Sequence, residues 1–297
     1  MTAIIMIAGT LAWGSLGAEE KAVDLWLGGD VNLGDGGHGQ LQGMAGIVQG
    51  AVGIVNLEGP VVERSQLRRG TLGLWNAPRA LAEISVLNVK VAGIANNHAS
   101  DAGAAARARP AQLLREHGIL PAGGPAGTAL LHLDDVTIAV TAHDLTRGVP
   151  TTLAGDLKAA RGQADVLVAT FHVTGPPSYL PRPELRQAVE LAYQAGASVI
   201  VAHGTHALGP VERREHAVIA WGLGNVAFAC DCTQEHDAIL LRVRLEPGKR
   251  VNAEVIPIQA GVNSQPALPS PDAKGIFDLL EAIGSNKLAR RGDRAAF

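Results

Sequence analysis

The sequence predicts an α/β or mixed α+β fold built around a β-sheet core, and three observations predict it. From Ala22 onward, short apolar runs alternate with stretches of helical pattern, which is typical of such a core. Hydrophobic residues make up 47% of the 297 residues, which excludes a disordered chain. This length suits one large domain or two small ones, and with only 3% aromatic residues the core must consist of Ala, Val, Leu and Ile.

Residues 1–20 are expected to form a signal peptide or an N-terminal anchor. Ala3 to Trp13 is an apolar run, shorter than the roughly 20 residues needed to span a bilayer, and small residues at 15, 17 and 18 could serve as a cleavage site. No Lys or Arg precedes the run, so an N-terminal strand is the alternative. We expect an exported protein, periplasmic or cell-surface, with the cytoplasm as the alternative, and membrane contact only through this segment.

The next region, residues 21–264, is expected to form the main domain. Five apolar runs are expected to be strands, at 23–27, 52–55, 89–95, 166–171 and 198–202. Helices are expected at about 104–117, 153–162 and 183–195, since Gly118 ends the first and Pro181 and Pro183 mark the start of the last. Residues 265–297 are expected to add a Pro- and Ser-rich linker at 265–271 and a C-terminal helix near 273–284.

Metal-ligating residue types follow all five runs, at the carboxyl ends of strands, where ligands collect in sheets of this kind. The residues are Asp30, Glu58, Asn97, His172, His203 and His206. A single such residue is usually part of a turn or a satisfied polar group, but six after five consecutive runs indicate a common site.

The proposed ligand set consists of oxygen and imidazole, without thiolate. Such ligands suit Mn, Fe, Zn or Co, and their number exceeds the three or four of one zinc site. They fit two divalent transition-metal ions about 3.5–4 Å apart that share a bridging carboxylate. Such a pair makes hydroxide available near neutral pH and binds the oxygens of a phosphoryl or acyl centre.

The charge balance and the cysteine content exclude further classes. The chain has 25 basic and 28 acidic residues, a net charge of −3, so we expect no nucleic-acid partner. Two cysteines, Cys230 and Cys232, are too few for a disulfide scaffold or a cysteine zinc fold. They could form a disulfide in an exported chain, or they could be two small residues packed in a strand.

Several motifs occur in a particular order along the chain. They are Gly29-Asp30, Asn56-Leu57-Glu58, Ala95-Asn96-Asn97-His98 with Asp101 and Gly103, His172, His203-x-x-His206 and Gly222-Leu223-Gly224-Asn225. In this order they resemble those of CapA-type proteins of poly-γ-glutamate capsule synthesis, within the calcineurin-like metallophosphoesterase superfamily. The resemblance runs from about Val23 to Arg244 and implies a four-layer αββα sandwich, in which two sheets are flanked by helices.

The resemblance also implies a role for each ligand residue. Asp30 and His206 would bind the first metal, and Glu58 would replace the usual bridging aspartate. The second metal would be bound by Asn97, His172 and His203. Asn32 stands where related phosphoesterases place a histidine ligand.

His98 resembles the histidine that steadies or protonates the leaving group, and Asp101 would orient it; a purely structural hydrogen bond is the alternative. Three arginines after Glu58 could bind an anionic substrate, or they could form a solvated charged loop. These are Arg64, Arg68 and Arg69.

The substrate-facing surroundings depart from the family pattern. The family often has His-Trp-Gly-x-Glu-Tyr at the fourth motif, whereas this chain continues His172-Val173-Thr174-Gly175 without the acidic residue. Asp35 lies where an arginine is common, and Ala202 replaces the glycine before His203. Gly222 to Ala227 formally matches a dinucleotide fingerprint, but no helical pattern follows it, which indicates a tight turn.

The sequence therefore predicts a metal-dependent hydrolase in which metal-bound hydroxide attacks a phosphoester or a related electrophile. Two alternatives stay open: a non-catalytic binding subunit of a polyanion synthesis or export complex, and a γ-glutamyl amide hydrolase or transferase that uses the same metals. The expected partners are an anionic small-molecule or polymer substrate and other capsule-synthesis subunits.

Overall fold

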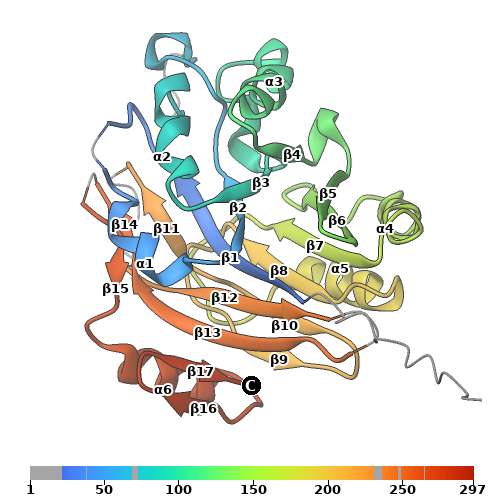
Figure 1. Ribbon diagram of the computed structural model, residues 1–297. Helices are drawn as coiled ribbons and strands as arrows, with labels where there is room; N and C mark the ends of the chain where they lie inside the picture. Colours follow the sequence, from blue (N-terminus) through green and yellow to red (C-terminus); the bar gives the residue numbers. More distant parts are fainter. Residues whose placement is uncertain (1–21, 38, 69–72, 231–235, 247–248, 264) are drawn as a thin grey trace, which may run out of the picture.

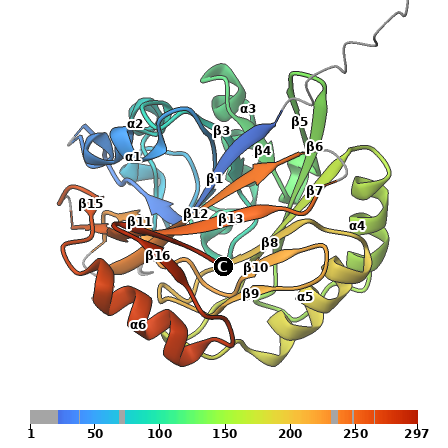
Figure 2. The same cartoon turned by 60° about the horizontal axis from the view of Figure 1, so that its bottom comes forward.

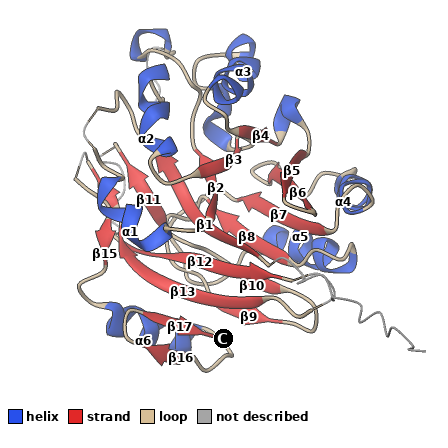
Figure 3. Cartoon of the chain, viewed as in Figure 1, coloured by secondary structure: helices blue, strands red, loops and turns tan. Residues whose placement is uncertain are grey.

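Two β-sheets lie face to face in the computed structural model, with helices on both outer sides (Figure 1, Figure 3). The structure describes residues 22–297 apart from 38, 69–72, 231–235, 247–248 and 264. The order of layers is helices, sheet, sheet, helices, so the expected four-layer αββα sandwich is confirmed.

The first sheet has the order β16-β17-β13-β12-β1-β2-β3-β4, with β11, β14 and β15 attached beside it. Its strands are β1 (Val23–Asn32), β2 (Val52–Leu57), β3 (Val89–Gly93), β4 (Leu120–Ala122), β11 (Asn225–Phe228), β12 (Asp237–Leu245), β13 (Asn252–Gln259), β14 (Gly261–Val262), β15 (Leu268–Pro269), β16 (Ala289–Arg291) and β17 (Arg294–Ala296). Along one side of β1, β12 pairs antiparallel with residues 23–27, and β11 then pairs parallel with residues 30–32. Strand β1 thus changes its neighbour just before Asp30.

The second sheet has the order β5-β6-β7-β8-β10-β9. Its strands are β5 (Ala129–Leu133), β6 (Val136–Asp144), β7 (Val166–His172), β8 (Val199–His203), β9 (Val211–Arg213) and β10 (Val218–Ala220). The inner strands β6, β7, β8 and β10 are parallel, and β5 and β9 close the two edges as antiparallel strands.

Three apolar clusters separate the four layers. The first fills the space between the two sheets and includes Leu27, Val168 and Val201, together with Phe277 from α6 (Ala273–Ile283). The second lies under the helices on the outer face of the first sheet: α1 (Ala45–Val48), α2 (Leu81–Ser85) and α3 (Arg109–Glu116). The third lies under α4 (Leu153–Arg161) and α5 (Pro183–Gln194), on the outer face of the second sheet.

Short 3-10 helices connect these elements. They are Gln42–Met44, Arg64–Gln66, Pro78–Ala80, Asn97–Ser100, Ala104–Ala108 and Gly124–Ala126. The helix expected at 104–117 is therefore a 3-10 segment followed by α3, which begins at Arg109 and has Pro110 in its first turn.

All five expected strands and the C-terminal helix are present. The sequence analysis missed the hairpin of β16 and β17, in which β17 pairs with β13 (Figure 2). The stretch expected to be a linker contains β15, which also pairs with β13. Gly224 has a φ of 73°, and the strand β11 rather than a helix follows it, as expected for a tight turn.

The expected leader, residues 1–20, lies outside the described residues, as does Cys232. Cys230 is disulfide-bonded, which was one of the two alternatives for the cysteine pair. In the part of the chain that the structure describes, no helix combines the length and the hydropathy that a membrane span requires.

Candidate metal centre

The carboxyl ends of parallel strands from both sheets meet at one place. In the first sheet, Asp30 is level with Asn56 on β2 and with Asn225 on β11. In the second sheet, His172 is level with His203. The N–H of Gly204, directly after β8, donates to Oδ2 of Asp30 at 2.8 Å and so joins the two sheets. The predicted ligands therefore converge from elements that are far apart in the sequence.

Three side chains form the centre of this cluster: Asp30, Glu58 and His172. Each offers a ligand atom, and these atoms all lie within 4.8 Å of one another. Nδ1 of His172 lies 3.8 Å from Oδ1 of Asp30, and Nε2 of His172 lies 3.8 Å from Oε1 of Glu58. All three are at least 98% buried, so a bound ion here would be shielded from solvent.

Among the described residues, Glu58 has no hydrogen-bond partner for either carboxylate oxygen, although its side chain is buried. Its backbone, in contrast, is fully held: its N–H donates to the carbonyl of Val31, and its carbonyl accepts from the side-chain amides of Asn32 and Asn76. Burial, and then the charges of Asp30 and Asp101, raise the pKa of Glu58 well above its usual value. A buried carboxylate held in place without a partner fits a cation ligand.

Asp30 is ionised despite its burial. Burial alone would raise the pKa of Asp30, but its electrostatic interactions with the imidazoles of His206, His172 and His203, together with the hydrogen bond from the N–H of Gly204, outweigh burial and lower the pKa. Its oxygens accept from the amide of Asn56 at 2.7 Å and from the N–H of Gly204. Asp30 therefore offers a charged and oriented ligand.

The two buried histidines are neutral. Burial lowers the pKa of His172 to about 4, and burial also lowers the pKa of His203. The ring of His172 lies between the amide of Asn56, 3.2 Å from Nδ1, and Oδ1 of Asn97, 2.7 Å from Nε2. In the described part of the chain, Nδ1 of His203 has no hydrogen-bond partner. Neutral imidazoles are the form that binds metals.

His206 completes the cluster from the loop after β8. Its Nδ1 lies 3.4 Å from Oδ2 of Asp30 and 2.9 Å from Oδ1 of Asn225. The backbone of His206 has a φ of 55°, a conformation that is strained for a non-glycine residue. Gly204 also has a positive φ, of 86°, and a Cβ there would lie 2.6 Å from the His172 ring, so the loop requires glycine.

His98 and Asp101 lie at the edge of the cluster. Nδ1 of His98 lies 2.7 Å from Oδ2 of Asp101, which also accepts from the N–H of Leu74 at 2.9 Å. Nε2 of His98 lies 3.9 Å from Oε1 of Glu58. Asp101 thus holds Nδ1, and Nε2 faces the centre of the cluster. The imidazole is 22% exposed, so solvent reaches this edge of the cluster.

Asn32 and the predicted arginines differ in their positions. The amide nitrogen of Asn32 donates to the carbonyls of Glu58 and Trp75, and its Oδ1 is buried without a partner. The guanidinium of Arg64 lies over the ring of Trp75, 5.0 Å from its centre. Arg68 is exposed and donates its backbone N–H to the carbonyl of Asp101, and Arg69 lies outside the described residues.

The sequence analysis missed four residues with a place in or beside this cluster. Asn56 and Asn225 orient His172 and His206, and both occur in the quoted motifs, which is the signal that could have found them. Arg107 and Arg147 line a cavity of about 230 Å³ with Asn97 and Asp144. No motif marks either arginine.

The fold and the cluster together define an αββα sandwich in which carboxylates and imidazoles gather at the carboxyl ends of the strands. The profile of the bacterial capsule synthesis protein family PGA_cap matches residues 40–144 and 128–230. The chain belongs to this family.

Two curated relatives carry names from capsule formation. The PGA biosynthesis protein CapA of Bacillus subtilis (strain 168) is 31% identical over 115 residues, and the capsule biosynthesis protein CapA of Bacillus anthracis is 27% identical over 131 residues. These matches cover 39% and 44% of this chain, and 29% of each relative. The aligned region thus spans less than a third of the curated relatives.

Two solved structures share the fold at low sequence identity. A hypothetical protein from Thermus thermophilus has a TM-score of 0.51 at 11% identity, covering 79% of this chain and 99% of that one. A candidate 5'-nucleotidase from Staphylococcus aureus, solved with alpha-ketoglutarate, has a TM-score of 0.50 at 11% identity. This match covers 88% of this chain and 58% of the other.

Proposed function

We propose that the protein is a metal-dependent hydrolase of the CapA type that holds two divalent transition-metal ions between its two sheets and cleaves a phosphoester or a related electrophile. The observation that carries the proposal is the buried, unpartnered carboxylate of Glu58 beside Asp30 and His172. The residues that would hold the ions are Asp30, Asn32, Glu58, Asn97, His172, His203 and His206.

Bound divalent ions lower the pKa of water and neutralise charge on phosphoryl or acyl oxygens. The chain's own contribution is to fix the groups around them. Asp101 holds Nδ1 of His98, so that Nε2 faces the substrate side and can donate a proton to the leaving group. Asn56 contacts Nδ1 of His172 and so helps to fix the orientation of the ring, which makes Nε2 the nitrogen that could bind an ion.

The cavity beside the centre supports an anionic substrate. Asn97 shares its wall with Arg107 and Arg147, and guanidinium groups bind carboxylate and phosphate through paired N–H groups. We therefore add Arg107 and Arg147 to the arginines expected to contact substrate. An anionic polymer or one of its precursors fits both the cavity and the capsule names of the relatives, and those names also support export to the cell surface.

Metal analysis tests the proposal directly. The purified protein, supplied with Mn or Zn and then desalted, is expected to retain about two ions per chain. The variants His172→Ala and His203→Ala are expected to lose at least one, whereas His236→Ala, which removes an exposed histidine elsewhere, is expected to keep both. A wild-type protein that remains metal-free after supplementation would refute the proposal.

The role of His98 has a separate test through Asp101→Asn. The substitution is expected to leave the metal content unchanged and to lower kcat by about tenfold to a hundredfold, because the imidazole loses the charge that orients it. The pH profile of kcat/KM should also lose one limb. Asp237→Asn, at an exposed position on β12, is the control, and equal kinetics in the two variants would remove His98 and Asp101 from the mechanism.

A second candidate function is a binding subunit without turnover. It is favoured by the fourth motif, where Thr174 and Gly175 follow His172 without an acidic residue, and by the biosynthetic names of the relatives. A panel of phosphomonoesters, phosphodiesters and γ-glutamyl amides separates the possibilities. Turnover that Asp30→Ala abolishes supports an enzyme, and the preferred compound distinguishes a phosphoesterase from a γ-glutamyl hydrolase or transferase. Binding of polyglutamate without turnover supports the subunit.

A further inference from the structure

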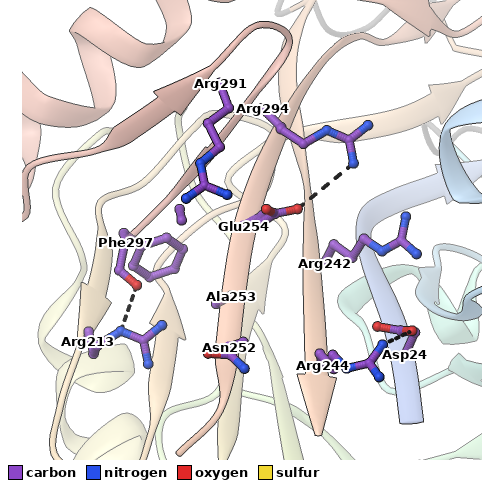
Figure 4. Close-up of a pocket in the computed structure, with 11 residues that line it drawn as sticks. Asp24, Arg213, Arg242, Arg244, Asn252, Ala253, Glu254, Arg291, Arg294 and Phe297 are labelled. Atoms are coloured by element: carbon purple, nitrogen blue, oxygen red, sulfur yellow. Dashed lines mark hydrogen bonds and ion pairs between the residues drawn. The ribbon is translucent and has the colours of Figure 1, made fainter. Parts of the chain in front are cut away.

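Arginine side chains gather at two cavities, one beside the metal centre and one at the other end of β1. The distant cavity, of about 540 Å³, includes Asp24 in its lining and lies beside the β16–β17 hairpin (Figure 4). There Arg244 lies 3.0 Å from Asp24, and Arg294 lies 3.9 Å from Glu254. The protein itself therefore neutralises part of the charge in that cavity.

The cavity beside the metal centre has two arginines that the protein leaves unpaired. Arg107 comes from the 3-10 helix Ala104–Ala108, and Arg147 comes from the loop after β6. Among the described residues, no carboxylate lies within ion-pair distance of either guanidinium group, and neither group makes a hydrogen bond. Asp144 also lines the cavity, but the two guanidinium groups outweigh its single charge.

The backbone around Arg147 is held in a tight turn at the end of β6. The N–H of Gly148 donates to the carbonyl of Leu145 at 2.9 Å and closes the turn. The N–H of Leu145 donates to the carbonyl of His172 at 2.8 Å. The turn that carries Arg147 is thus bonded directly to the backbone of a proposed metal ligand.

Three polar side chains join this turn to the loop after β7. Asp144 is level with His172, and Oδ1 of Asp144 accepts from both the N–H and the hydroxyl of Thr146. Because that hydroxyl has one hydrogen, it accepts in turn from the hydroxyl of Thr174, 2.7 Å away. Asp144, Thr146 and Thr174 therefore tie the two loops together and limit the positions that Arg147 can take.

The cavity is small and adjoins the centre. Its volume of about 230 Å³ is below the roughly 300–1,000 Å³ of pockets that enclose a whole ligand, so it fits one end of a substrate. Asn97 lines the cavity, and its Oδ1 lies 2.7 Å from Nε2 of His172. A substrate whose scissile group lies at the centre would therefore place its neighbouring atoms beside Arg107 and Arg147.

We propose that Arg107 and Arg147 form a subsite for a second anionic group of the substrate, and that Asp144, Thr146 and Thr174 position Arg147. The inference rests on the proposed function, because the metal centre would hold the first group. It specifies the substrate class as a compound with two anionic groups a few bonds apart, rather than a phosphomonoester of an uncharged alcohol. The second group is a carboxylate or a phosphate, since both accept paired N–H groups from guanidinium.

Calorimetry with matched phosphonates tests the subsite without requiring turnover. The probes, added to protein supplied with Mn, are meta-carboxyphenylphosphonate, its neutral meta-carbamoyl counterpart and meta-phenylenediphosphonate. Each doubly anionic probe is expected to bind about fivefold or more tightly than the carbamoyl compound, and this ratio of affinities should shrink as salt rises. The tighter of the two identifies the second group as carboxylate or phosphate.

Substitutions assign this ratio to individual residues. Arg147→Gln is expected to abolish it, whereas Arg115→Gln, which removes the same charge from α3, should keep it. Thr146→Val is expected to reduce the ratio about threefold, because Arg147 is held less firmly, and Thr146→Ser should restore it by keeping the hydroxyl. The metal content should be the same in all four variants.

Equal affinity of the wild type for charged and neutral probes, or no binding of any probe, would overturn the inference. A ratio that survives in Arg147→Gln would do the same. Equal effects of Thr146→Val and Thr146→Ser would remove the positioning role. A protein that shows the ratio but turns over no substrate keeps the subsite and loses the hydrolase activity, whereas a hydrolase without the ratio keeps the proposed function and loses the subsite.

Discussion

Glu58 is the side chain with the largest conflict between its charge and its surroundings. Its backbone is held by three hydrogen bonds, which fix the position of the carboxylate, yet neither oxygen has a hydrogen-bond partner among the residues that the structure describes. Without a cation, burial and the nearby charge of Asp30 make the ionised form of Glu58 less favourable in the folded protein than in the unfolded chain, so its pKa is raised. A cation would remove this cost and ionise the group.

Glu58→Gln should therefore affect stability and metal binding in opposite directions. In chelator-treated protein at pH 8, the variant is expected to be about 1–2 kcal/mol more stable than the wild type, since the neutral amide carries no penalty for buried charge. Its metal content should fall. Thermal unfolding and metal analysis measure the two effects, with Glu215→Gln, at an exposed position, as the control. A variant that is both less stable and fully loaded with metal would contradict the assignment.

Because the pKa of His172 is lowered, we expect the stability of the metal-free protein to depend on pH. Its pKa is about 4 in the folded state and near 6.5 in the unfolded chain, so between these values only the unfolded chain takes up the proton. The stability that neutral His172 allows is complete above pH 6.5 and is lost as the pH falls toward 4, by up to about 1.4 kcal/mol per pH unit.

Denaturant unfolding between pH 4 and 8 measures this dependence. His172→Gln is expected to flatten the curve over that window, whereas His236→Gln should leave it unchanged. An unaltered slope in His172→Gln would show that the histidine titrates normally in the folded protein.

The clustering of the proposed ligand residues could be predicted from the sequence because each one ends or follows an apolar run. Asp30 and His172 needed only that position and their residue type. Asn56 and Asn225 contact residues of other elements, His172 at the end of β7 and His206 in the loop after β8, and the register that places them there is not encoded in any local pattern. Arg107 reaches the cavity from a 3-10 segment with no recognisable signature.

At the scale of elements, the centre depends on the change of neighbour along β1. The chain pairs with β12 up to Leu27 and with β11 from Asp30 onward. The change brings β11 close enough for the carbonyl of Gly224 to accept from the N–H of Asp30 at 3.2 Å. At Gly29 a Cβ would overlap that carbonyl oxygen, so this crossing needs glycine.

Gly29→Ala is consequently expected to displace β11 and, with it, the asparagine that orients His206. We expect a loss of several kcal/mol in stability and a lower metal content, because the clash is with backbone that cannot rotate away. Gly46→Ala, in α1 with no atom within 4 Å of the added methyl group, should be neutral or stabilising by up to about 1 kcal/mol. Thermal unfolding of the two variants provides the comparison, and equal stability would disprove the close approach of β11.

The elements that the sequence predicted well are those with long apolar patterns. Strands β7 and β8 are almost continuously buried, and their expected bounds differ from the observed ones by one residue, at one end of β7 and at both ends of β8. The strands of the C-terminal hairpin are three residues long, and the first is fully exposed and rich in arginine. Strand β17 pairs with β13, and β16 pairs with β17; no local pattern of hydrophobicity reveals this pairing.

At the scale of the whole molecule, the layer between the two sheets extends to the C-terminal helix. Ile276, Phe277 and Leu280 of α6 are buried in the same cluster as residues of β1 and β8. The region after residue 264 therefore contributes to the common core, and we expect the sandwich and α6 to unfold together.

Phe277→Ala tests this cooperativity. The substitution is expected to cost about 3–5 kcal/mol and to lower the melting temperature of a single calorimetric transition. Val86→Ala, at a side chain that is 49% exposed, should change stability by less than about 0.5 kcal/mol. A separate early transition in Phe277→Ala would show that α6 unfolds independently of the sandwich.

The hydrogen bond from Gly204 to Asp30 has a consequence for where this protein can accumulate. The proposed ligands come from both sheets, which the hydrogen bond between Gly204 and Asp30 joins. An ion bound there would therefore link the two sheets, and the unfolded chain could not bind it in this way. At a free metal concentration a hundred times the Kd, the bound ion would add about 2.7 kcal/mol to the free energy of unfolding. Metal supply in the surrounding compartment would then determine how much of the protein survives proteolysis, independently of any reaction it catalyses.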